Sequence, residues 1–150
     1  MSTRAVDTVR GIETTLAVDK ADNDTFVVIK CATQINWSSD KAMLEANCYG
    51  GKEMLPSGDD AVKSMTINGQ VKEYSTADLA TNVSSYEIET WHNAGTLKKW
   101  KYARPHEGDT VREFEGFVTN YTEEGSPNGL QTYTATITPR TKGTLTKVTA

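Results

Sequence analysis

The chain has 150 residues, of which 37% are hydrophobic and 24% are charged. This length suits one domain with a sizeable core, and the composition excludes intrinsic disorder of the whole chain. A net charge of −4 argues against a protein that grips nucleic acid, because such proteins carry a basic patch or stripe. There is no apolar run of membrane-spanning length and no apolar signal segment, so neither a membrane protein nor ordinary secretion is expected.

The first third of the chain predicts short strands joined by turns. Residues 1–12 are expected to form a flexible N-terminal arm. Strands are predicted at 14–19, 25–30 and 35–47, with the turn residues ADND between the first two. The segment DKAMLEAN at the end of the third run is compatible with either a strand or a helix.

Residues 48–61, CYGGKEMLPSGDDA, give the longest loop signal in the chain, and long loops inside compact domains are usually functional. Met54 and Leu55 lie at its centre with no obvious core to join. Either the loop folds back on its own domain, or it is an arm that buries these two residues in a neighbouring subunit. The second hypothesis assigns the following residues to an inter-subunit loop: Gly50, Gly51, Met54, Leu55, Pro56 and Gly58.

Two predicted strands have an unusual polar face. In the strand at 61–73, Met65 and Ile67 alternate with polar residues, and in QTYTATIT the residues Tyr133, Ala135 and Ile137 alternate with threonines. The polar positions are uncharged: Thr66, Asn68 and Gln70 in the first strand, and Thr132, Thr134 and Thr136 in the second. A generic β-domain also exposes Thr, because Thr favours strands.

Between these strands the period changes to that of a helix. Ser75 and Asp78 fit a capping box, and apolar residues continue at helical spacing. Gly95 is a plausible helix stop, since Gly tolerates the left-handed conformation. One helix is therefore predicted over about 76–93, with a shorter helix followed by a hairpin as the alternative.

The last third predicts three strands, at 96–104, 109–121 and 129–138, and an extended tail at 140–150. The order of strands, one helix and again strands favours a mainly β fold. We expect an antiparallel β-sandwich or barrel with one flanking α-helix, forming a single domain over 1–150.

No arrangement of residues points to an enzyme, a cofactor or a metal. His92 is predicted near a helix end and His106 in a loop. The sequence contains no GxSxG nucleophile motif and no phosphate-binding glycine loop. Glu113 and Glu115 share a strand face, which an exposed strand explains as well as catalysis does. Cys31 and Cys48 lack zinc-ligand spacing and are expected to be buried free thiols, with a disulfide between them as the alternative.

Aromatic residues in the chain raise two possible binding functions. The run LKKWKYAR, residues 97–104, interleaves aromatic and basic residues as a single-strand nucleic-acid surface does, but a solvated cationic strand explains it better. A monomeric β-sandwich that binds a ligand such as a carbohydrate would use clustered exposed aromatics, which Trp91, Trp100 and Tyr102 could supply.

Two longer pieces, GGKEMLPSGDDAVKSMTINGQV and GFVTNYTEEGSPNGLQTYTATITPRTKGTL, resemble the major tail, or tail tube, protein of long-tailed bacteriophages. The resemblance covers about 14–147 in element order and spacing, with departures at 20–36 and at the short turn PHEG. It implies a β-sandwich with one helix and no enzymatic activity, in which hexameric rings stack into a tube that conducts double-stranded DNA during ejection. The loop at 48–61 would contact neighbouring subunits, and the two termini would seal ring to ring.

The resemblance also implies partners and a location. The chain would bind further copies of itself, the tape measure protein, the tail terminator and baseplate proteins, in a virion tail assembled in the host cytoplasm. DNA would pass without specific binding. A lumen of neutral polar side chains is wetted and holds no phosphate, so the face with Thr134 and the face with Asn68 are predicted to line it.

Overall fold

The structure is a computed structural model that describes residues 8–30, 32–58, 61–106, 108–141 and 143–148. Parts of the predicted N-terminal arm and C-terminal tail therefore lie outside the described residues, as do Cys31 and the side chain of Cys48. None of the helices among the described residues is long and apolar enough to span a membrane.

The predicted mainly β fold with one α-helix is confirmed. The elements in chain order are η1 (Gly11–Glu13), β1 (Thr15–Val18), β2 (Val27–Val28), β3 (Ala32–Asp40), β4 (Met43–Cys48), β5 (Gly51–Pro56), β6 (Val62–Gln70), η2 (Leu79–Thr81), α1 (Ser85–Ala94), β7 (Lys98–Ala103), β8 (Thr110–Glu124), β9 (Thr132–Pro139) and β10 (Thr144–Lys147).

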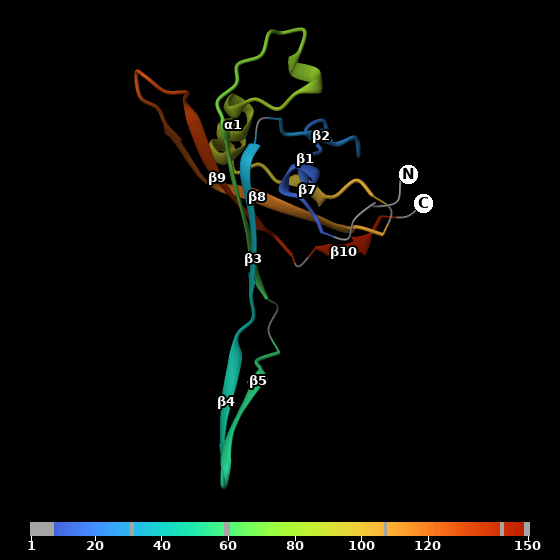
Figure 1. The fold of residues 1–150 in the computed structure, drawn as a ribbon, viewed down its shortest axis with the longest axis vertical. Coiled ribbons are helices and arrows are strands. Elements are labelled where there is room, and N and C mark those ends of the chain that lie inside the picture. The colour runs from blue at the N-terminus through green and yellow to red at the C-terminus, as the bar shows by residue number, and fades with distance from the viewer. Residues whose placement is uncertain (1–7, 31, 59–60, 107, 142, 149–150) are drawn as a thin grey trace.

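Eight strands form one antiparallel sheet in the order β2-β1-β7-β8-β9-β6-β3, with β10 paired to the start of β8. The other two strands, β4 and β5, pair with each other and with no other strand in the described part of the chain. Figure 1 shows this β4–β5 hairpin projecting from the body along the long axis of the molecule. The molecule therefore has a body, built by the large sheet and α1, and a separate projecting hairpin.

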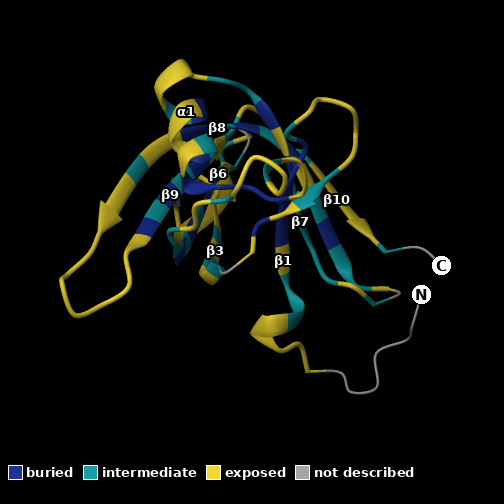
Figure 2. Ribbon diagram, turned by 90° about the horizontal axis from the view of Figure 1, so that it is seen from above, coloured by how far each residue is buried: buried dark blue, intermediate teal, exposed yellow. Residues whose placement is uncertain are grey.

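The core lies inside the bend of the large sheet. The alternating apolar residues predicted in β6 and β9 are buried there, including Met65, Ile67 and Ile137. The sheet bends enough that the ring of Trp37 on β3 lies 5.4 Å from that of Phe114 on β8. Figure 2 shows the buried residues gathered at the centre of the body, with exposed residues on the loops around it.

Helix α1 covers part of this apolar face, but it begins about nine residues later than predicted. Its N-cap is Ser84, whose Oγ accepts a hydrogen bond of 3.3 Å from the amide of Glu87. At the predicted start, the Oγ of Ser75 donates instead to the carboxylate of Asp78, in a turn that leads into the short 3-10 helix η2. The predicted end is confirmed, because Gly95 caps the helix in the left-handed conformation with φ of 66°.

The prediction of a loop over 48–61 is also wrong in part. Residues from Gly51 to Pro56 form β5, and DKAMLEAN contributes to β4 rather than to a helix. The register opposes Met43 to Pro56, and the two strands stay paired as far as the turn at the tip. An alternating pattern was not visible in KEMLP because apolar residues occur on both faces of this hairpin.

Candidate functional site

The six residues predicted to line a lumen lie together on one face of the body. Strands β6 and β9 are neighbours, and their register opposes Thr66 to Thr136, Asn68 to Thr134 and Gln70 to Thr132. Side chains of directly opposed residues point to the same side of a sheet. The structure therefore brings the two predicted polar faces into one surface, while their role as a channel lining stays a prediction.

This surface continues onto strands that the sequence analysis did not assign to it. On β3, Gln34, Asn36 and Ser38 oppose Asn68, Thr66 and Ser64. On β8, Asn120 and Thr122 oppose Thr136 and Thr134. The alternation of polar and apolar residues in TQINWSSD was the signal that could have identified the β3 part. We call the outward surface of β3, β6, β9 and the end of β8 the polar face.

The side chains of the polar face bond to one another across the strands. The hydroxyl of Thr134 donates to Oδ1 of Asn68 over 2.7 Å, and Nδ2 of Asn68 donates to Oε1 of Gln34 over 3.2 Å. The hydroxyls of Thr119 and Thr138 lie 3.0 Å apart. Because these groups are neutral and largely satisfy each other, the surface offers water polar contacts without offering an anion a fixed charge.

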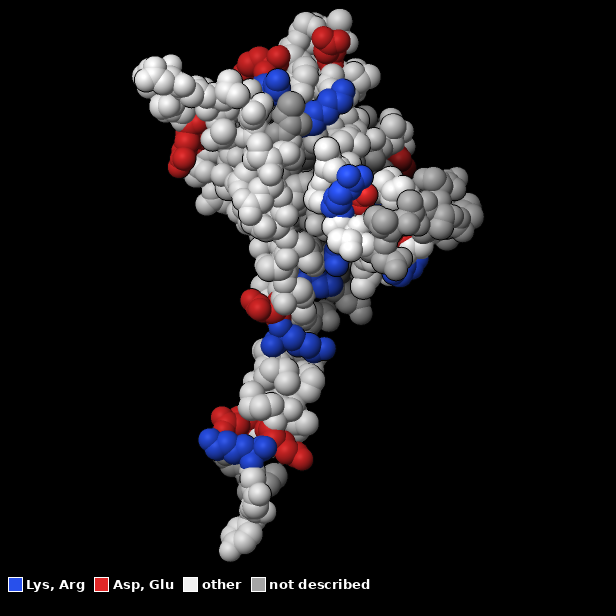
Figure 3. Space-filling view, viewed as in Figure 1, with Lys and Arg blue, Asp and Glu red and all other residues white. Residues whose placement is uncertain are grey.

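Charged residues mark only the ends of the polar face. Asp40 lies at the base of the hairpin and Glu124 at the far end of β8, and neither Lys nor Arg occupies the positions between them. Figure 3 shows uncharged atoms over β9 and along β3 above the base of the hairpin. Near the far end of β8, burial and a hydrogen bond to Glu123 raise the pKa of Tyr121, so its hydroxyl stays neutral.

The lysines of the basic run on β7 have partners within the chain. Lys98 is buried and donates to the carbonyl of Lys20. Lys99 pairs with Asp24 at 2.9 Å, and this hydrogen bond raises the pKa of Lys99. Lys101 lies 3.9 Å from Glu113. The lysines are therefore engaged with carboxylates and backbone rather than arranged to hold phosphates.

The aromatic residues suggested for carbohydrate binding are core residues. Trp100 is 1% exposed, and its ring meets that of Trp91 edge to face at 6.0 Å. Tyr102 is half-buried and lies beneath the guanidinium of Arg112. No stacking platform is presented to solvent by these residues, so this alternative loses the feature that motivated it.

The residues considered for catalysis each have a structural contact. Glu115 lies 3.3 Å from Arg140, and Nδ1 of His92 lies 2.9 Å from the carbonyl of Val118. Among the described residues, no group of three or more His, Cys, Asp or Glu side chains could hold a metal ion. The described geometry gives no support to an acid–base pair or a nucleophile.

The projecting hairpin is the second candidate surface. Leu44 faces Leu55 on one side of it, and Met43 and Met54 lie on the other side. These four side chains are all exposed. The predicted interface residues Met54 and Leu55 are thus outside the core, and no described element of the chain covers either side of the hairpin.

The predicted glycines and proline lie at the bends of this hairpin. Gly50 is in the turn at the tip with φ of 109°, and Gly58 follows β5 with φ of 89°. Both angles are in the region that favours glycine. Gly51 and Pro56 begin and end β5. The assignment of all six residues to a subunit interface stays a prediction.

Comparison with solved structures finds this fold in several tube assemblies. The chain matches a protein in the tail of an empty gene transfer agent particle with C6 symmetry, at a TM-score of 0.68 and 16% identity over 94% of this chain and 99% of that chain. It matches the SPP1 tail tube at 0.71 and 10% identity, covering 95% and 80%. It matches a chain of the sheath-tube complex of the PVC extracellular contractile injection system at 0.67 and 12% identity, covering 96% and 95%.

Sequence comparison alone finds neither a matching family model nor a matching curated protein. The likeness is therefore carried by the arrangement of the strands, the helix and the hairpin over nearly the whole chain. The chain has the fold of the tail tube proteins.

Proposed function

We propose that this chain is a structural virion protein that polymerises into a tail tube and has no enzymatic activity. The observation that carries the proposal is the neutral polar face, which lies on four adjacent strands with an open edge at each end. Among the described strands, β3 pairs only with β6, and the pairing of β7 with β8 ends at Gly116. Beyond Val118, whose carbonyl is contacted by His92 of α1, the edge of β8 is thus available to a second copy, as is the outer edge of β3.

These two edges fit one another in a head-to-tail repeat. The four strands β3, β6, β9 and β8 alternate in direction. Since the unit contains an even number of strands, β8 of one copy and β3 of the next run antiparallel at every joint. Repetition by rotation closes such a sheet into a ring and removes the exposed edges, which would otherwise invite aggregation.

A ring closed in this way has the polar face either inside or outside. We propose the inside, with Thr66, Thr134 and Thr136 among the lining residues, because an outer surface in bulk water more often carries charge. Each Lys or Arg on a lining would add salt-dependent affinity for phosphate, and the polar face carries none between its ends. Double-stranded DNA would pass along it without being held.

The proposal gives the remaining parts of the single domain a role in stacking. Six copies would form each ring, by analogy with the sixfold symmetry of the gene transfer agent tail. The hairpin, the N-terminal arm and the C-terminal tail would join rings to one another. Tape measure, terminator and baseplate proteins would be the other partners in the tail, which is assembled in the host cytoplasm.

The test is the size of the purified protein as its concentration rises. We expect rings and then long tubes, seen by sedimentation and by electron microscopy of negatively stained samples. A folded protein that stays monomeric at every concentration, including in the presence of tail initiation complexes from a phage lysate, would overturn the proposal.

A further inference from the structure

The tip of the hairpin presents one aromatic side chain entirely to solvent. Tyr49 is fully exposed, and it occupies the turn between β4 and β5 together with Gly50. Each strand of the hairpin has six residues, which carries the tip about 20 Å from the hairpin base. A tyrosine held this far from its own core stabilises nothing in its own chain, and tyrosine is enriched among the residues that dominate binding interfaces.

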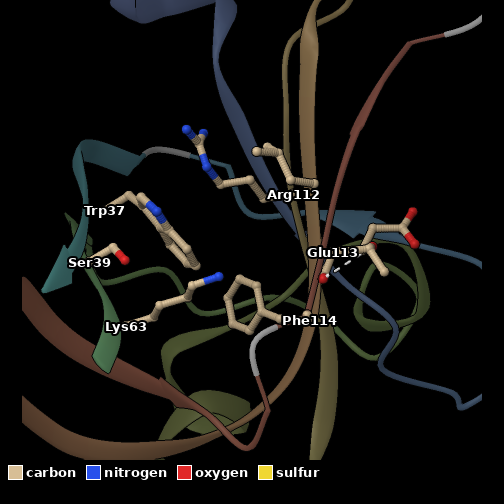
Figure 4. A pocket seen from close by; sticks show the side chains of 9 residues that line it. Trp37, Ser39, Lys63, Arg112, Glu113 and Phe114 are labelled. Carbon is tan, nitrogen blue, oxygen red and sulfur yellow. Dashed lines mark hydrogen bonds between the residues drawn. The ribbon is translucent and has the colours of Figure 1, made fainter. Parts of the chain in front are cut away.

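The body contains a cavity with aromatic and cationic walls. It has a volume of about 450 Å³ and lies between β3, β6, β8 and β10. Figure 4 shows Trp37 and Phe114 on two sides of it, with Lys63 extending between them and Arg112 above. The exposed Leu145 on β10 lies at its rim. Burial of a further apolar ring here would cover the half-exposed Trp37.

Arg112 gives this cavity a specific chemistry. Its guanidinium lies over the rings of Trp37 and Tyr102, 5.6 Å and 5.5 Å from their centroids. It forms no ion pair with a described residue. Its hydrogen-bond donors are therefore available to an incoming hydroxyl or carboxylate, and its plane is suited to stacking on another ring.

The hairpin tip carries the matching groups. Tyr49 supplies a ring with a hydroxyl, and Glu53 on β5 supplies an exposed carboxylate that forms no ion pair with a described residue, whereas Glu45 pairs with Lys52 at 3.0 Å. The hairpin points away from the body of its own chain (Figure 1). Its tip cannot enter its own cavity, so a tip that fills this cavity would belong to a second copy.

We infer that Tyr49 of one copy inserts into the cavity formed by Trp37, Phe114, Leu145 and Arg112 of another copy. The inference rests on the proposed polymerisation and names the contact that joins one ring to the next. The knob and the cavity lie on different parts of the chain, so the contact is heterologous. Contacts of this kind do not close on themselves along the axis and give an open polymer with one direction.

The first test replaces Tyr49, which cannot unfold the body because it lies outside the core. Tyr49→Ala should raise the concentration needed for tube growth at least about 30-fold, since loss of a central interface anchor has effects of that size. Tyr49→Phe keeps the ring and loses only the hydroxyl offered to Arg112, so its effect should be much smaller than that of Tyr49→Ala. The matched control is Tyr86→Ala, an exposed tyrosine on α1, which should polymerise normally. Normal growth of Tyr49→Ala would overturn the inference.

The second test locates the tip in assembled tubes without removing its ring. A photoreactive benzoylphenylalanine in place of Tyr49 should cross-link to residues 37, 112–114 or 145 of another copy, identified by mass spectrometry of the digested tubes. Cross-links that fall only elsewhere would overturn the cavity assignment while leaving the tube intact. A parent protein that forms no polymer at all would instead overturn the proposed function, and this inference with it.

Discussion

The two antiparallel strand pairs β6–β9 and β4–β5 differ in what covers them. In β6–β9, one face is buried in the core, with Ile67 and Ile137 inaccessible to solvent, and the other face is neutral and polar. In β4–β5, apolar side chains occupy both faces, and Met54 and Leu55 are about half exposed. An isolated two-stranded hairpin has marginal stability in water at best.

The comparison teaches where the chain is self-sufficient and where it is incomplete. The body encloses its own core, so its alternation of polar and apolar residues follows from folding alone. The hairpin buries almost nothing within its own chain, so its apolar residues call for a surface on another molecule. Changes to the two regions should therefore separate folding from assembly.

The largest expected effect comes from truncating the core of the body. Trp100 is 1% exposed and packs against Trp91. Trp100→Ala should lower the free energy of unfolding by about 3–5 kcal/mol, measured by urea denaturation of the monomer. The matched change on the hairpin, Leu55→Ala, should lower it by less than about 0.5 kcal/mol. Equal losses in the two variants would show that the hairpin belongs to the folding unit.

Next in size is the effect of charges on the hairpin. The double variant Met54→Asp and Leu55→Asp should leave the urea midpoint of the monomer unchanged, because both side chains are outside the core. It should abolish tubes, because each contact would desolvate two carboxylates. Sedimentation of parent and variant at equal concentration measures this. A normal yield of tubes from the variant would show that the hairpin is not an interface.

A smaller effect distinguishes the two candidate starts of the helix. Ser84→Ala removes the hydrogen bond that the amide of Glu87 donates to Oγ of Ser84, and should cost about 1 kcal/mol. Ser75→Ala removes only a bond in an exposed turn and should cost less than about 0.5 kcal/mol. Thermal unfolding of both variants measures which loss is larger. A helix over 76–93 would instead give the larger loss for Ser75→Ala.

The two candidate N-caps, Ser75 and Ser84, show why the sequence alone did not predict where the helix begins. Ser75 and Asp78 have the spacing of a capping box, but so do Ser84 and Glu87, and local spacing cannot choose between them. Tertiary contacts decide: the amine of Lys20 bonds the carbonyls of Leu79 and Asn82 and the carboxylate of Glu87. These bonds hold the segment before α1 as a short 3-10 turn (Leu79–Thr81) followed by extended backbone at Asn82 and Ser84, so no α-helix runs through it.

The strands and the polar surface were more predictable than the hairpin. Alternation in MTIN and TYTATIT identified the polar positions of β6 and β9 because their other face is buried. The same rule failed in KEMLP, where no core dictates an alternation, and the pairing of Leu44 with Leu55 requires knowledge of the turn at Tyr49. The prediction of Trp91 and Trp100 as possible exposed aromatics is wrong because the sequence alone does not distinguish a core aromatic residue from a surface one.

A change on the polar face should have only a small effect on stability. Thr134→Lys removes one hydrogen bond to Asn68 and should lower the free energy of unfolding by about 0.5 kcal/mol. Its effect on transport should be larger, because each ring would gain a circle of cations on the lining. DNA ejection from mutant particles should slow and become sensitive to salt. Identical time courses at low and high salt for parent and mutant would remove Thr134 from the lumen.

The most direct measurement is a helical reconstruction of the assembled tube by electron cryomicroscopy, at a resolution that places side chains. We expect Thr66 and Thr134 to face the channel, with β3 of each copy paired to the end of β8 in its neighbour. A tube with these residues on its exterior, or with the edge of β3 unpaired, would contradict the account.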